Sequence, residues 1–242
     1  MDNGIYVTLS RQLALFRDMD VTANNIANST TTGYNADHVM FESYLFKDMS
    51  QGKPSTVAMA NNVRDYRNLE AGPIKVTNNP LDLVVQNGYF MVDTPLGQRY
   101  TRSGNFTLSN AGELVTMEGY PVLSNAGQPI TFPEDTQTID IGSIGNIKVN
   151  GDDFGTLGIA RFSNEQLLER AGNNLFVSNV APEVADETLL VVQGALEGSN
   201  VQPIQEMTHM MEVSRGVSNT AKYVEVVYDL QRKAATAWTQ QG

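Results

Sequence analysis

Cysteine is absent from the 242 residues, and only two histidines, His38 and His209, are present. Without cysteine the chain forms no disulfide and offers no thiolate for catalysis or metal binding. Glu206 and His209 make one Glu-x-x-His pair, whereas a di-iron bundle needs two such pairs and further carboxylates. Nothing singles out a pair of carboxylates for acid–base work. We therefore expect no cofactor, no metal site and no enzyme activity.

Basic runs and long apolar runs are also missing. The chain has 16 Lys and Arg and 27 Asp and Glu, which gives a net charge of −11, and its basic residues are scattered along the sequence. No run of basic residues could bind along a phosphate backbone, so no nucleic-acid partner is expected. The short apolar runs predict no membrane insertion. The start, Met1-Asp2-Asn3, has no basic region, and Arg11 interrupts the first apolar stretch, which predicts no cleaved secretory signal. Composition alone favours the cytoplasm.

A helical period runs through the first 28 residues. Positions spaced alternately by four and three form a heptad-like series, and all but Gln12 are apolar: Ile5, Leu9, Gln12, Phe16, Met19, Ala23 and Ile26. The Thr30-Thr31-Thr32 run and Gly33 predict the end of this helix.

The last 40 residues carry a second helical period. Two series with a spacing of seven run through them, namely Met207, Ser214, Ala221, Tyr228, Ala235 and Met210, Val217, Val224, Gln231, Trp238. Ser199 or Asn200 can cap this helix, and Pro203 suits its first turn. An ordinary amphipathic helix docked on its own core would show the same period. We expect instead that the two terminal helices pack as a coiled-coil-like pair.

Short apolar runs separated by turn residues fill the middle of the chain. Asn87-Gly88, Asn110-Ala111-Gly112, Glu118-Gly119, Asn125-Ala126-Gly127 and Asn150-Gly151 suit tight hairpins. The sequence therefore predicts an α+β fold. Residues 1–34 and 200–242 form a helical core domain, 69–199 form an antiparallel β domain, and 35–68 form an extended connector.

Motifs at both ends and in the middle carry a family resemblance. Ala23-Asn24-Asn25-Ile26-Ala27-Asn28 with Thr31-Thr32-Gly33-Tyr34 resembles the N-terminal signature of flagellar rod and hook proteins, and Gln193 to Val201 with Glu206-Met207 resembles their C-terminal signature. Similar internal motifs are Asn79 to Leu83, Asn87 to Phe90, Tyr100 to Phe106 and Gly112 to Val115. The opening Met1 to Val7 with Ser10-Arg11-Gln12 is most similar to the proximal-rod members.

The resemblance implies a structural subunit of the basal-body rod, the drive shaft that transmits torque from motor to hook. Its partners would be the other proximal rod proteins, the distal rod protein and, during delivery, the flagellar type III export apparatus. Export without cleavage would take the chain from the cytoplasm to the rod in the periplasm. A distal rod subunit, a β-domain binding module with a coiled-coil stalk and a wall hydrolase are the alternatives.

Two sets of residues are predicted to serve assembly. Apolar residues of the helical periods would pack between helices and between subunits: Ile5, Leu9, Phe16, Met19, Ala23, Ile26, Met207, Met210, Val217, Ala221, Val224, Tyr228 and Trp238. The resemblance implies that motif residues fix turns or contact a neighbour: Asn24, Asn25, Asn28, Gly33, Glu197, Ser199, Asn200 and Val201. Asn24, Asn25 and Asn28 would be costly to bury unless their amides are hydrogen-bonded. Solvated positions at the helix end are the alternative for these three.

Overall fold

A computed structural model describes residues 2–48, 55–183 and 190–239. The chain divides into two compact units. The helix–hairpin unit comprises residues 1–27, 37–68 and 202–242, and the β unit comprises residues 28–36 and 69–201. Each unit thus gathers segments that are far apart in the sequence, because the chain leaves the helix–hairpin unit twice and returns to it twice.

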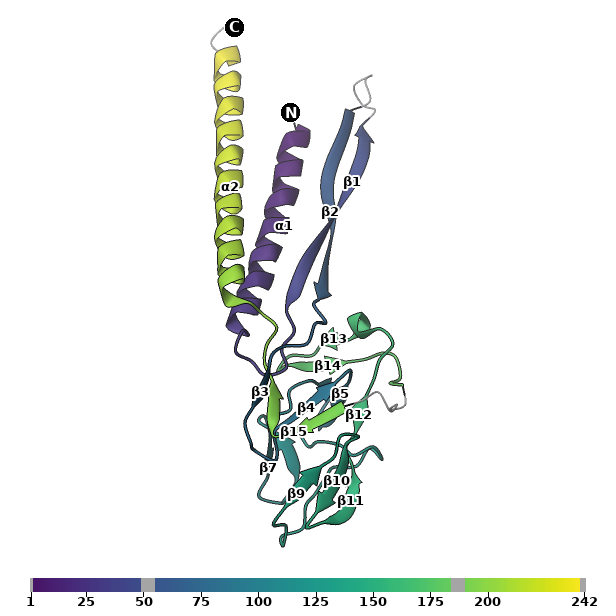
Figure 1. Ribbon diagram of the computed structural model, residues 1–242. Coiled ribbons are helices and arrows are strands. Elements are labelled where there is room, and N and C mark those ends of the chain that lie inside the picture. The colour runs from purple at the N-terminus through teal and green to yellow at the C-terminus, as the bar shows by residue number, and fades with distance from the viewer. Residues whose placement is uncertain (1, 49–54, 184–189, 240–242) are drawn as a thin grey trace. The chain divides into compact units, whose positions relative to one another are not determined.

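Two long helices and one long hairpin build the helix–hairpin unit (Figure 1). Helix α1 spans Asp2–Ala27 and helix α2 spans Pro203–Thr239. Strands β1 (Asp37–Asp48) and β2 (Ser55–Arg67) pair antiparallel, with Asp37 opposite Arg67 and Asp48 opposite Ser55. Helix α1 contacts α2 and both strands of the hairpin. In the described part of the chain, neither helix has the length and apolar content needed to cross a membrane.

The extended connector predicted for residues 35–68 is wrong, because most of this segment is the β1–β2 hairpin. Apolar residues occupy 39–41 and 44–46 without interruption, so β1 shows no alternation of apolar and polar residues. The pairing register also shifts, between Glu42 and Ser43. A search for one uninterrupted period of two therefore misses the strand.

The predicted coiled-coil-like pairing of the helices is also wrong, although both long helices are present. Leu9, Phe16, Met207 and Tyr228, which that pairing would bury, are 49%, 44%, 51% and 67% exposed. The buried residues of the two helices are mostly small or polar: Ala14, Thr22, Asn25, Val213 and Thr220. A coiled coil buries large apolar side chains at its a and d positions, so this contact is of a different kind.

Small residues let the antiparallel helices α1 and α2 approach closely. A Cβ atom at Gly216 would lie 3.3 Å from Leu15 Cδ1. Nearer the other end of the contact, His209 Nε2 lies 3.0 Å from an oxygen of Asp18. The paired positions run in opposite directions along the two helices, so the contact is antiparallel.

Short antiparallel strands build the β unit. A five-stranded sheet has the order β12-β5-β6-β14-β13, from strands Tyr89–Thr94 (β5), Gly97–Thr101 (β6), Ile159–Ala160 (β12), Glu169–Arg170 (β13) and Leu175–Val177 (β14). A three-stranded sheet has the order β11-β10-β9, from Ile139–Ile141 (β9), Asn146–Val149 (β10) and Asp152–Thr156 (β11).

Three further strand pairs and a 3₁₀ helix complete the β unit. The pairs are β15 (Leu190–Gln193) with β4 (Leu83–Gln86), β16 (Ala195–Glu197) with β3 (Ile74–Val76), and β7 (Phe106–Leu108) with β8 (Leu114–Thr116). The 3₁₀ helix η1 spans Glu165–Leu167. Strands β10 and β11 join through Asn150 and Gly151, which have φ of 54° and 93°. Two consecutive positive φ angles are typical of a type I′ turn, and they agree with the tight hairpin predicted from Asn150-Gly151.

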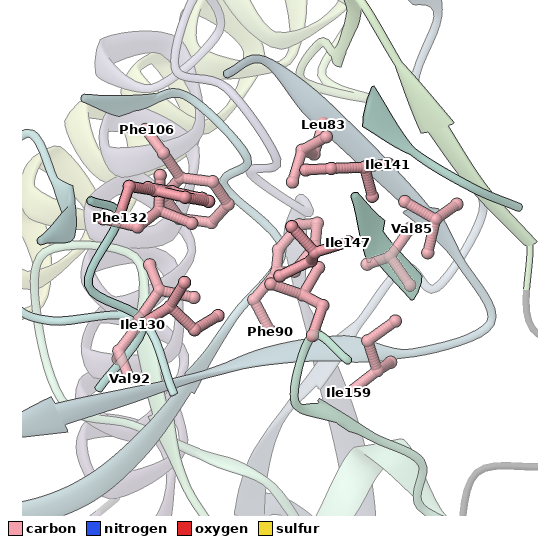
Figure 2. Packing of buried hydrophobic residues seen from close by; sticks show 14 of the residues in the cluster. Leu83, Val85, Phe90, Val92, Phe106, Ile130, Phe132, Ile141, Ile147 and Ile159 are labelled. Carbon is pink, nitrogen blue, oxygen red and sulfur yellow. The ribbon is translucent and has the colours of Figure 1, made fainter. Parts of the chain in front are cut away.

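The sheets enclose one large apolar core and a smaller aromatic cluster. Leu114 is among the fully buried residues of the large core. Phe90, Val92 and Ile147 are also fully buried, and Figure 2 shows them packed with other side chains of this core. The aromatic cluster includes Tyr89, Tyr100, Phe162 and Phe176, and its rings meet edge to face. This edge-to-face packing stabilises the β unit.

Candidate functional site: a clasped segment and two apolar helix faces

The segment that follows α1, residues 28–36, is hydrogen-bonded to the rest of the β unit, and we call it the clasped segment. Its backbone pairs with the residues that end and follow strand β16. The N–H of Gly33 donates to the carbonyl oxygen of Glu197 at 2.8 Å, and the N–H of Asn200 donates to that of Tyr34 at 3.2 Å. The N–H of Ala36 donates to Asn200 Oδ1 at 2.7 Å. The chain therefore enters and leaves the β unit through two hydrogen-bonded segments.

At Gly33 the backbone of the clasped segment lies directly against the backbone of Arg102 and Ser103. The φ of Gly33 is +65°, in the left-handed region that favours glycine. A Cβ atom there would lie 2.6–2.7 Å from the carbonyl carbon and oxygen of Arg102 and the nitrogen of Ser103. Any side chain would therefore push backbone against backbone. The sequence indicated a helix stop at this residue, and the family resemblance implied that it fixes a turn or contacts a neighbour.

A buried ion pair lies beside Gly33. Arg102 Nε is 3.3 Å from Glu197 Oε2, and these side chains are 5% and 4% exposed. The other Glu197 oxygen accepts the N–H of Gly72 at 3.0 Å, and Glu165 approaches Arg102 to 3.7 Å. Burial lowers the pKa of Arg102, but Glu197, Tyr89 and Glu165 outweigh it and raise that pKa overall. The guanidinium is therefore charged at every physiological pH.

Two side chains near strands β13 and β14 hold the other side of the clasped segment. The Arg170 guanidinium lies 4.5 Å from the centre of the Tyr34 ring, and its Nη2 donates to the carbonyl oxygen of Asn35. Asn174 Nδ2 donates to the carbonyl oxygen of Thr32 at 2.8 Å. A guanidinium over an aromatic face adds an attractive interaction to these hydrogen bonds. The segment is thus held along most of its length.

The C-terminal motif residues complete the clasp. Tyr34, Ala36 and Val201 form a small buried apolar cluster. Ser199 is buried, and its hydroxyl accepts the N–H of Val201 at 3.2 Å. Asn200 is half-buried, and its Nδ2 donates to the carbonyl oxygen of Glu70 at 2.8 Å. The motif residues from both ends of the chain therefore meet at one place in the β unit.

The three asparagines at the end of α1 differ in their environments. Asn25 is 1% exposed: its Oδ1 accepts the N–H of Asp37 at 3.0 Å, and its Nδ2 donates to the carbonyl oxygen of Asp37 at 2.8 Å. The same nitrogen donates to Glu206 Oε2 at 3.2 Å. Asn24 is exposed, and Asn28 is half-buried and accepts the Thr31 hydroxyl at 3.1 Å. Asn25 thus joins α1, the start of β1 and α2 within the helix–hairpin unit.

Large apolar side chains are exposed on both helices. On α1, Leu9, Leu13 and Phe16 are 49%, 63% and 44% exposed and share one face at i, i+4, i+7 spacing. On α2, exposed apolar residues recur at i, i+3, i+7 in two groups, Ile204, Met207, Met211 and Tyr223, Val226, Leu230. Exposed apolar stripes of this kind are typical of interaction surfaces. We call them the apolar helix faces.

The predicted packing residues fall into three groups. Leu9, Phe16, Ala23, Met207, Ala221 and Tyr228 are exposed, and Met19, Ile26, Met210, Val217 and Val224 are half-buried. The side chains of Ile5 and Trp238 lie outside the described residues. Sequence reasoning did not select Arg102, Arg170, Asn174 or Glu206 as site residues. Arg102 and Glu206 lie within motifs that carry the family resemblance. Arg170 and Asn174 carry no sequence signal that we can identify.

Buried polar groups hold backbone segments of the β unit, and both helices expose large apolar side chains. The fold and site therefore define a structural subunit built for assembly. Three family models match the chain. Flagella basal body rod protein matches residues 5–35, flagellar hook protein FlgE/F/G D1 domain matches 84–149, and flagellar basal body rod FlgEFG protein C-terminal matches 192–237. Gly33, Arg102 and Glu197 lie within these matches.

Curated relatives match along nearly the whole chain. The FlgF flagellar basal-body rod protein of Caulobacter vibrioides is 35% identical over 97% of both chains, and that of Mesorhizobium japonicum is 36% identical over 91% of both. The FlgG rod protein of Bacillus subtilis is 32% identical over 93% of this chain and 94% of its own. The chain therefore belongs to the flagellar basal-body rod proteins, as a FlgF-type member.

Proposed function

We propose that the chain is a structural subunit of the flagellar basal-body rod that assembles with unlike rod subunits through its apolar helix faces. The observation that carries this proposal is the match of both ends and the middle of the chain to rod and hook family models, together with FlgF relatives covering 97% of its length. The exposed apolar residues on α1 and α2 are the surface that neighbouring subunits would cover.

Assembly supplies the free energy for covering these faces. Fully burying one Leu, Phe or Met side chain is worth about 1.5–3 kcal/mol. Leu9, Leu13 and Phe16 are each about half exposed, so covering this one face contributes about 2–4 kcal/mol before ordering costs. The groups on α2 add comparable amounts, and together these contributions offset the cost of association.

The clasp suits the mechanical role of a rod. Load carried along the helices passes to the β unit through the clasped segment and through residues 197–201, which are directly continuous with α1 and α2. Backbone hydrogen bonds tie these two segments together at Gly33 and Tyr34, and the buried Arg102–Glu197 pair supports them. We propose that this cross-linking holds the clasped segment and residues 197–201 together when torque is transmitted.

Delivery to the rod is part of the proposal. We propose that the flagellar type III apparatus exports the chain without cleavage and that its working place is the rod in the periplasm. Rod relatives at both 35% and 32% identity support the destination.

Charged substitutions on α1 test the assembly proposal. Leu13→Glu with Phe16→Glu should abolish swimming and incorporation into basal bodies, because neighbours cannot cover a face that carries two carboxylates. Both side chains are exposed, so the secreted monomer should keep its circular dichroism spectrum. The matched control, Leu13→Met with Phe16→Leu, keeps the face apolar and should swim. Swimming by the double-Glu variant would contradict the proposal.

A further inference from the structure

The negative charge of the chain is concentrated in one of its two units. The β unit contains 16 Asp and Glu but only six Lys and Arg, which gives it a net charge of −10. The helix–hairpin unit contains 11 Asp and Glu and 10 Lys and Arg, for a net charge of −1. Nearly all of the total of −11 therefore belongs to the β unit.

The surface of the β unit reflects this imbalance. Exposed carboxylates come from many of its elements, including Asp93, Glu118, Asp140 and Asp152. Among its cations, Arg102 is buried, and Arg170 is half-buried against the Tyr34 and Phe176 rings. Lys75 and Lys148 are exposed, but the exposed carboxylates of this unit outnumber them.

The apolar faces and the charge lie in different units. The exposed apolar stripes Leu9 to Phe16 and Ile204 to Met211 are on the nearly neutral helix–hairpin unit. Burial of apolar surface depends little on moderate salt, whereas repulsion between exposed charges falls as the Debye length shrinks from about 30 Å at 0.01 M to about 8 Å at 0.15 M salt. Salt therefore has little effect on the apolar attraction between two copies of the chain, whereas it screens the repulsion between their charges.

We propose that the acidic β unit is an electrostatic barrier to self-association, so that the apolar helix faces engage a less acidic, unlike neighbour more readily than a second copy of this chain. An association that places the β units of two copies next to one another brings together two domains of net charge −10, and like charges held close disfavour a pairing. A neighbour with a neutral or basic outer domain carries no such penalty. This goes beyond the proposed rod function and rests on it only for the identity of the associating faces.

Sedimentation velocity of the full chain at 10 mM and 150 mM NaCl tests the proposal. We expect the apparent dissociation constant of self-association to fall at least about tenfold at the higher salt, because screening removes the repulsion. The variant Asp93→Asn, Glu118→Gln, Asp140→Asn, Asp152→Asn lowers the β-unit charge to −6. It should associate at least about tenfold more tightly than the parent at 10 mM NaCl and lose most of the salt dependence.

A matched control keeps the charge at the same four positions. The variant Asp93→Glu, Glu118→Asp, Asp140→Glu, Asp152→Glu should behave like the parent at both salt concentrations. Self-association that is equal at 10 mM and 150 mM NaCl, or equally salt-dependent in the neutralised variant, would overturn the barrier. Chains that stay monomeric throughout, the neutralised variant included, would overturn it as well. None of these results bears on whether basal bodies contain the chain, which the motility and incorporation assays measure separately.

Discussion

Substituting Gly33 tests the geometry of the clasp most sharply. Alanine at a φ of +65° costs about 1–2 kcal/mol, because the left-handed region crowds its Cβ. At Gly33 that Cβ also lies within 2.7 Å of the Arg102 and Ser103 backbone, and relieving such overlap costs about a further 1–3 kcal/mol. We therefore expect Gly33→Ala to lower the unfolding free energy of the β unit by about 2–5 kcal/mol.

Gly127 provides the matched control, because its φ is +75° and nothing lies within 4 Å of the position its Cβ would take. Gly127→Ala should cost only the conformational part, about 1–2 kcal/mol. The assay is urea unfolding followed by amide hydrogen exchange of peptides from β5 and β6, so that it reports on the β unit alone. With a slope of about 1–3 kcal/mol per molar urea, the difference is resolvable.

Substitution by asparagine further separates the cost of the left-handed conformation from the cost of the Cβ overlap. Asparagine tolerates the left-handed region better than alanine but still has a Cβ atom. Gly33→Asn should therefore remain strongly destabilised, whereas Gly127→Asn should be nearly neutral. If Gly33→Ala and Gly127→Ala agree within about 0.5 kcal/mol, the close approach of the clasped segment to Arg102 is not what requires glycine, and the reasoning fails.

Two further substitutions test buried polar contacts by the same hydrogen-exchange measurement, read in the unit concerned. Asn25→Ala removes the buried amide that binds both backbone groups of Asp37, and it should lower the unfolding free energy of the helix–hairpin unit by about 2–3 kcal/mol. The control, Asn24→Ala at an exposed position, should lower it by under about 0.5 kcal/mol. Equal effects of the two substitutions would contradict the structural role of Asn25. Glu197→Gln should cost the β unit about 3 kcal/mol, since it leaves a buried Arg102 short of a counter-charge. Asp153→Asn breaks an exposed pair and should cost under about 1 kcal/mol, and a comparable loss would refute that difference.

The sequence predicted the helices better than their packing. Spacings of three and four are a property of one helix and are visible in Leu9, Phe16 and Met19 without any partner. Which face turns inward depends on the partner, and here it is the face of Ala14, Thr22 and Asn25, where small and polar groups allow close contact. A hydrophobic period thus identified the exposed face as readily as the buried one. In a subunit whose apolar faces await neighbours, that ambiguity is expected.

The clasp was only partly predictable. Gly33 and Glu197 were selected because motifs of a known family contain them, but nothing local pairs residues so far apart in sequence. Asn24, Asn25 and Asn28 look equivalent in the sequence, and only the approach of Asp37 makes one of them a buried structural amide. Long-range hydrogen bonds of this kind depend on the assembled β unit and on the hairpin start, which composition and period do not encode.

The most direct test of the central claim is a reconstruction of basal bodies purified from cells that carry this gene and from a deletion strain. We predict density for both terminal helices of the chain inside the rod of the parent, in contact with helices of other rod subunits. We also predict an incomplete rod and loss of swimming in the deletion strain, both restored by the intact gene. A complete rod and normal swimming without the chain would contradict its assignment as a structural rod subunit.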